Sequence, residues 1–130
     1  MVGLVETQTS VAVEKLRQIE IEVSAEKGSF NLFALIERED SLGKWDIVVA
    51  ANWIDTERKE LINTIASKIR EKLSENEQLL LSRIVILSPS DILVRSLNMF
   101  RVEHGMSKLS NNNFNGTIIK EAYLITSKQQ

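Results

Sequence analysis

About a third of the way along the chain, two apolar runs of strand length flank a short charged segment. The runs lie at about residues 30–37 and 44–51, and the segment between them contains Gly43. This pattern predicts a β-hairpin. In both runs, residues at odd and even positions are apolar, for example Ile47 and Val48. Since alternate side chains of a strand point to opposite faces, we expect helices to cover both faces of this hairpin.

A helix is predicted before the hairpin, over residues 10–27. Apolar residues recur there every three or four positions, which places them on one stripe of a helix. Thr9 or Ser10 can cap the start, and Gly28 can end the helix in a left-handed conformation. The stripe consists of Ala12, Leu16, Ile19 and Val23.

A second helix is predicted after the hairpin, from Asp55 or Thr56 to about residue 73. Next, Ser74 and Glu77 have the spacing of a capping box, which predicts a short helix reaching about Leu81. The inward stripe expected for the second helix is Ile62, Ile65, Ile69 and Leu73.

The remaining elements alternate between strand and helix patterns. Residues 83–87 predict a third buried strand, and Pro89 predicts the first position of a helix that reaches about Asn98. The asparagine-rich segment at residues 110–116 predicts a turn, and residues 117–126 predict a last strand. This order indicates an α/β or α+β fold, with a mixed β-sheet built on a central hairpin and covered by helices.

Composition narrows the class of protein. The 130 residues, 43% hydrophobic and 26% charged, predict one globular domain over residues 1–130. The net charge of −2 argues against binding to nucleic acid or to an anionic membrane. The chain contains no cysteine and starts without a signal-like or membrane-spanning apolar stretch, so we expect a cytoplasmic protein.

Residues 32–50 and 119–124 resemble the minimal nucleotidyltransferase fold of small prokaryotic proteins. In that family one strand ends in Leu-Phe-Gly-Ser, the next carries Asp-x-Asp, and a later segment reads Ile-x-x-Glu-Ala. Here Leu32-Phe33-Ala34-Leu35 stands at the first motif, Asp46-Ile47-Val48 at the second, and Ile119-Lys120-Glu121-Ala122 at the third. The resemblance implies a helix-covered mixed sheet of the kind that the hydrophobic pattern predicts.

The positions that bind nucleotide and metal in that family are replaced in this chain. Ala34 and Leu35 stand where glycine and serine let backbone amides approach a triphosphate, and Val48 stands where a second carboxylate helps Asp46 to hold Mg²⁺. The strand predicted at residues 83–87 offers no acid. The resemblance therefore implies a non-catalytic member of the family, a pseudoenzyme.

Asp46 has two interpretations. In the first, it is solvated near the start of its strand or pairs with Lys44 or Arg38, because a buried unpaired carboxylate is costly. In the second, it joins Glu37 or Asp40 in a carboxylate cluster, which would make the chain a metal-dependent nucleotidyltransferase or nuclease.

Two further residues are candidates for function. His104 is the only histidine and follows Glu103, and an imidazole oriented by an acid is the usual general base. Residues adjacent in sequence do not face one another, so a structural or exposed role is favoured for His104. Trp53 either covers the core or anchors an interface.

Together these observations favour a non-enzymatic protein-interaction module over an enzyme. We expect a homodimer or a complex with a protein partner, a regulatory or antitoxin-like role, and neither a cofactor nor a metal ion. The alternative is the metal-dependent enzyme that uses Asp46 with Glu37 or Asp40.

Overall fold

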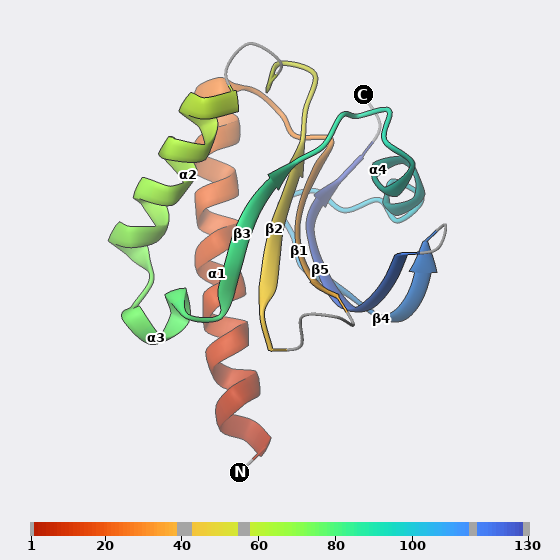
Figure 1. Ribbon diagram of the computed structural model, residues 1–130. Helices are drawn as coiled ribbons and strands as arrows, with labels where there is room; N and C mark the ends of the chain where they lie inside the picture. Colours follow the sequence, from red (N-terminus) through yellow and green to blue (C-terminus); the bar gives the residue numbers. More distant parts are fainter. Residues whose placement is uncertain (1, 39–42, 55–57, 115–116, 129–130) are drawn as a thin grey trace.

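The chain forms a five-stranded mixed β-sheet with helices on both faces (Figure 1). A computed structural model describes residues 2–38, 43–54, 58–114 and 117–128. The strands are β1 (Leu32–Arg38), β2 (Trp45–Ala50), β3 (Leu81–Ile86), β4 (Ser107–Phe114) and β5 (Thr117–Ser127). The helices are α1 (Val2–Lys27), α2 (Arg58–Lys72), α3 (Glu75–Gln78) and α4 (Ile92–Leu97). This architecture confirms the predicted α/β or α+β class.

The predicted hairpin lies at the centre of the sheet. The strand order is β3-β2-β1-β5-β4, and β1 is antiparallel to both of its neighbours. Leu35 stands opposite Ile47 across the hairpin. β2 and β3 are parallel, and β4 is antiparallel to β5. β3 and β4 are therefore the two edge strands.

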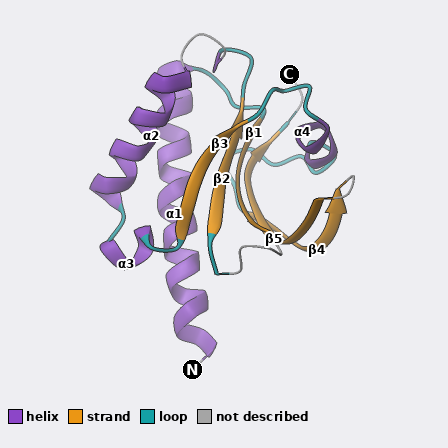
Figure 2. Ribbon diagram, in the orientation of Figure 1, coloured by secondary structure: helices purple, strands orange, loops and turns teal. Residues whose placement is uncertain are grey.

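Helices cover both faces of this hairpin, as its apolar pattern predicts (Figure 2). Side chains at alternate positions join two separate hydrophobic clusters, one under α1 and α2 and the other under α4. The hairpin residues under α1 and α2 are Phe33, Leu35, Trp45, Ile47 and Val49. Those on the face of α4 are Leu32, Ala34, Ile36, Val48 and Ala50.

The predicted apolar stripe of α1 is confirmed, since Ala12, Leu16, Ile19 and Val23 are all buried. The predicted start is wrong, because α1 begins at Val2 and Thr9 lies inside the helix. Gly28 follows the helix at φ +128°, and a Cβ atom there would lie 3.0 Å from Cδ1 of Trp53. None of the described helices is long and apolar enough to span a membrane.

The predicted inward stripe of α2 is confirmed at Ile65, Ile69 and Leu73 and is wrong at its first position. Leu61 is fully buried whereas Ile62 is 37% exposed, and Ile65 and Ile69 are buried as predicted. The predicted caps at Asp55 and Thr56 lie outside the described residues.

The capping box of α3 is confirmed. The hydroxyl of Ser74 accepts from the amide of Glu77, and the carboxylate of Glu77 accepts from the amide of Ser74 at 2.8 Å. The helix is shorter than predicted, because Leu81 already begins β3.

Three further predictions require correction. The third strand is not buried: β3 is an edge strand, and its apolar residues are half-buried. Pro89 precedes the helix, and Asp91 caps α4 by accepting from the amide of Leu93. Residues 111–113 belong to β4 rather than to a turn, because pairing with β5 satisfies their backbone. The last strand is confirmed as β5.

We expect Glu77→Gln to destabilise the protein near neutral pH by about 1–2 kcal/mol. Glu77 is nearly buried, and Lys15 of α1 donates to it at 2.7 Å. This hydrogen bond lowers the pKa of Glu77, so the ion pair stabilises the fold above the unfolded-state pKa of the carboxyl group. The contribution is lost as pH falls through the lowered pKa of the folded state. Urea unfolding at neutral and acidic pH measures both effects.

The control for this prediction is the acidic measurement itself. At a pH below the lowered pKa of the folded state, the carboxyl group of the parent protein is protonated, and the difference between parent and Glu77→Gln should nearly vanish. An equal difference at both pH values would show that the charge on Glu77 does not contribute.

Candidate functional site

Asp46 lies in β2 on the face of α4 and is 3% exposed. Its carboxylate is paired with Arg83 of the neighbouring strand β3, with 3.4 Å between Oδ2 and Nε. The sequence predicts that Asp46 is solvated or pairs with Lys44 or Arg38. Asp46 is instead buried and the ammonium group of Lys44 donates to the carbonyl of Leu79, while the side chain of Arg38 lies outside the described residues. Arg83 belongs to a strand distant in sequence, and for that reason local spacing does not reveal it.

Glu37 lies on the opposite face of the sheet from Asp46. Ile36 and Val48 belong to the cluster under α4. Asp46 is two positions from Val48 and so points to the same face, whereas Glu37 follows Ile36 directly and points to the other face. The carboxylate of Glu37 accepts from the amide of Gly43 at 2.7 Å. The hairpin therefore does not bring Glu37 and Asp46 together.

The third carboxylate of the predicted cluster, Asp40, lies outside the described residues. Among the residues that are described, no group of three or more histidine, aspartate or glutamate side chains is arranged to hold a metal ion.

His104 contacts an acid, although not its sequence neighbour. Its Nδ1 atom lies 2.6 Å from Oε1 of Glu20, which comes from α1, 84 positions away in the sequence. The carboxylate of Glu20 is fully buried, whereas the imidazole of His104 is 41% exposed. Glu103, the acid predicted from sequence, pairs instead with Lys128 at 2.7 Å. An imidazole oriented through one nitrogen by a carboxylate leaves its other nitrogen available for proton exchange.

The sequence analysis did not identify Glu20 as a candidate, although its position in the predicted helix indicates burial. It lies four residues after Leu16 and three before Val23, so it falls on the buried stripe of α1. An acid at such a position requires a partner, and the chain offers one imidazole.

Trp53 packs against the core. Its ring centroid lies 5.4 Å from that of Phe30, and its indole nitrogen donates to the carbonyl of Ser29 at 2.9 Å. These contacts agree with the interpretation of Trp53 as a cover over the core. Its use as an interface anchor stays a prediction.

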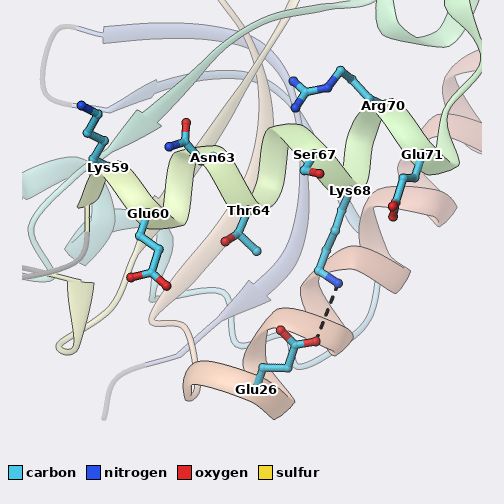
Figure 3. A pocket seen from close by; sticks show the side chains of 9 residues that line it. All are labelled: Glu26, Lys59, Glu60, Asn63, Thr64, Ser67, Lys68, Arg70 and Glu71. Carbon is cyan, nitrogen blue, oxygen red and sulfur yellow. Dashed lines mark ion pairs between the residues drawn. The ribbon is translucent and has the colours of Figure 1, made fainter.

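A wide depression of about 930 Å³ follows the outer side of α2 (Figure 3). Its lining is entirely polar or charged, and Lys68 bridges to Glu22 at 3.2 Å and Glu26 at 3.7 Å of α1. The hydrogen bond that Lys68 donates to the carboxylate of Glu22 raises the pKa of Lys68. The depression is lined by Glu26, Lys59, Glu60, Asn63, Thr64, Ser67, Lys68, Arg70 and Glu71. Such ion pairs hold α1 to α2, and the lining has the polar character of a solvated helix surface.

The edge of β3 has a different character. Its residues Ile84, Val85 and Ile86, with Leu87 just beyond, are apolar and only half-buried. Leu87 donates its amide to the carbonyl of Val49 in β2. Since backbone groups alternate in direction along a strand, the N–H and C=O groups of Ile84 and Ile86 point to the open edge.

A groove of about 270 Å³ lies beside this edge, between β3 and α2. Its apolar lining includes Ala66 and Ile69 of α2 together with Leu81 and Ile84 of β3. Ile62 lies one helical turn before Ala66 and is 37% exposed. The strand edge and the groove therefore adjoin on the same side of the molecule.

On the opposite edge strand, β4, the exposed side chains among the described residues are polar, and the half-buried Leu109 packs toward the cluster under α4. Lys108 and Ser110 are exposed, and the ammonium group of Lys108 lies 3.6 Å from the carboxylate of Glu121. The nearby Tyr123 and Glu121 raise the pKa of Lys108. A charged lysine on an edge strand opposes pairing with another sheet.

Comparison with protein-family models, curated proteins and solved structures finds no match to this chain. The resemblance to nucleotidyltransferases thus rests on the residues of this chain alone.

We expect no heat of binding when millimolar Mg²⁺ or Mn²⁺ is titrated into the protein in a calorimeter. Asp46 and Glu37 lie on opposite faces of the sheet, and one carboxylate already paired with Arg83 binds such ions weakly. The matched control is Asp46→Asn. Heat that disappears in this variant would contradict the prediction and would favour the metal-dependent enzyme.

Proposed function

We propose that the chain is a non-catalytic protein-interaction module that forms a homodimer through the open edge of β3. The observation that carries the proposal is a row of half-buried apolar side chains on a strand whose outer backbone groups face no other strand of the described sheet. Proteins usually protect such an edge with charge or proline, because it readily pairs with another chain. The stretch Ile84–Leu87 carries neither.

A second copy of the chain fits this edge by symmetry. A two-fold axis through Val85 pairs Ile84 of one copy with Ile86 of the other in antiparallel orientation. Both residues direct their N–H and C=O groups outward, so each pair exchanges backbone hydrogen bonds. The pairing places β-branched side chains opposite one another, which stabilises antiparallel strands.

The contrast between the two edges supports β3 over β4. Lys108 and Arg83 both pair with an acid of their own sheet, but Lys108 lies within the described part of β4, whereas the apolar stretch Ile84–Leu87 at the β3 edge contains no charged side chain. A net charge of −2 on each copy produces little repulsion. The regulatory or antitoxin-like role, the cytoplasmic location and the nucleotidyltransferase-like scaffold belong to the same proposal.

The first test is a disulfide at the proposed two-fold axis. The chain contains no cysteine, so Val85→Cys introduces a single thiol. In the proposed register the two Val85 residues form a non-hydrogen-bonded pair with Cα atoms about 4.5 Å apart, a separation that a disulfide can span. We expect mild oxidation to convert most of this variant to a covalent dimer, which non-reducing electrophoresis measures.

Ser110→Cys is the matched control, because it places an exposed thiol on the other edge strand. Equal cross-linking of the two variants at low protein concentration would overturn the β3 interface.

The second test introduces a charge at the same position. Val85→Lys places two ammonium groups opposite each other and removes two valines from the interface, so we expect the dissociation constant of the dimer to rise at least about tenfold. Sedimentation velocity over a concentration series measures the constant. Ser110→Lys is the control and should leave it unchanged. A parent protein that is monomeric throughout the series would overturn the proposal.

A further inference from the structure

His104 directs one ring nitrogen to a buried acid and keeps the other for a reaction. Its Nδ1 atom lies 2.6 Å from Oε1 of Glu20, whose carboxylate is fully buried. An ionised carboxylate only accepts hydrogen bonds, so Nδ1 carries a hydrogen atom and the lone pair of the neutral ring lies on Nε2. The imidazole is 41% exposed, and Nε2 has no hydrogen-bond partner among the described residues. The contact with Glu20 therefore leaves the nucleophilic nitrogen of an accessible ring unoccupied.

The backbone of His104 is fixed in an uncommon conformation. Its φ of +50° lies in the left-handed region, which His104 alone adopts among the described residues other than glycine. Its carbonyl accepts from Nε of Arg17 at 2.7 Å, and its amide donates to Oγ1 of Thr126 at 3.2 Å. Such conformations persist where surrounding contacts hold them, and they are concentrated at functional sites. These bonds and the contact with Glu20 fix the position of the imidazole.

The buried carboxylate compensates the charge that a reaction at Nε2 creates. When the lone pair of Nε2 forms a bond to an electrophile, the hydrogen atom stays on Nδ1 and the ring becomes positively charged. The carboxylate of Glu20 stabilises this charge from a site that water does not reach. The positive ring in turn stabilises the carboxylate, whose Oε2 atom has no hydrogen-bond partner among the described residues. Glu20 therefore favours the product of such a reaction over the neutral ring.

The cationic side chains around this turn favour an anionic electrophile. The guanidinium group of Arg17 is held beside the turn by its bond to the carbonyl of His104. Arg101 lies three positions before His104 and is exposed, and Lys128 bonds the adjacent Glu103 at 2.7 Å. Arginine and lysine side chains bind phosphoryl oxygens through charge-assisted hydrogen bonds. An activated phosphoryl group is thus the class of electrophile that fits this turn.

We propose that His104 accepts a phosphoryl group on Nε2 and that Glu20 is its positioning residue. The lone pair of Nε2 attacks the phosphorus atom of an activated donor such as phosphoramidate. The bond from phosphorus to the amine nitrogen breaks, and ammonia leaves with the bonding electrons. The hydrogen atom of Nδ1 stays in its bond to Glu20, so the ring is positively charged in the product. The phosphoryl group then adds up to about two negative charges to this surface.

The test is phosphorylation of the full chain by phosphoramidate. His104 is the only histidine, so mass spectrometry at alkaline pH counts phosphohistidine at a single residue. We expect one group per chain, placed on Nε2 by phosphorus NMR spectroscopy, at a rate at least about tenfold above that of a free histidine peptide. Nitrogen NMR spectra of the unmodified protein should show the hydrogen atom of the neutral ring on Nδ1. His104→Gln should take up no phosphoryl group.

Glu20→Gln separates the role of the carboxylate from the exposure of the imidazole. The amide of glutamine has no charge and can donate as well as accept, so it no longer keeps the hydrogen atom on Nδ1. We expect this variant to be phosphorylated about ten- to a hundredfold more slowly than the parent, with both tautomers of the ring present. Glu103→Gln is the matched control. It removes the acid next to His104 in sequence and should keep the tautomer and, within about twofold, the rate of the parent.

Either of two results would contradict the proposal. One is a parent protein that is phosphorylated no faster than the free peptide. The other is a folded Glu20→Gln variant that keeps the rate and the tautomer of the parent. The comparison with the peptide and the tautomer of the ring are both measured on the parent protein, so they decide the question if Glu20→Gln does not fold.

Discussion

The structure depends on burying both faces of the β1–β2 hairpin. Both strands carry apolar side chains on both faces, so each face of the hairpin must be covered by helices. α1 and α2 cover the face of Phe33 and Leu35, and α4 covers the face of Ala34 and Ile36. This constraint places the hairpin in the middle of the sheet, because an edge strand cannot be covered equally well. The remaining strands then take the outer positions.

The same constraint explains how far the fold can be predicted from sequence. The hydrophobic period and the capping residues depend only on neighbouring positions in the sequence. The predictions that rest on them, namely the hairpin, the stripe of α1 and the capping box of Ser74 and Glu77, are therefore confirmed. Strand order is not local: the pattern of residues 83–87 is that of a buried strand, but β3 lies at an edge because pairing continues from β1 toward β5. Likewise, asparagines that favour a turn are held in β4 by pairing with β5.

The candidate site is harder to predict than the fold, for a geometric reason. Alternation along β1 and β2 is readable from sequence and already separates Glu37 from Asp46 once the apolar positions are assigned to faces. The contacts of Glu20 with His104 and of Asp46 with Arg83 join distant segments, so no spacing within one element reveals them. The sequence does show that Glu20, an acidic residue, lies on a stripe of α1 that is otherwise apolar, and a buried carboxylate requires a partner from another segment.

The two ends of the sheet differ in the contacts that hold them. At β3 the apolar edge gains stability only if a second copy covers it, since half-buried isoleucine and valine side chains lose contact with water when strands pair. At the other end, the connection before β4 is held to α1 through the left-handed turn at His104, whose imidazole lies 2.6 Å from the buried carboxylate of Glu20. β1 and β2 lie between these ends and are buried on both faces, so the core of the sheet separates its two ends.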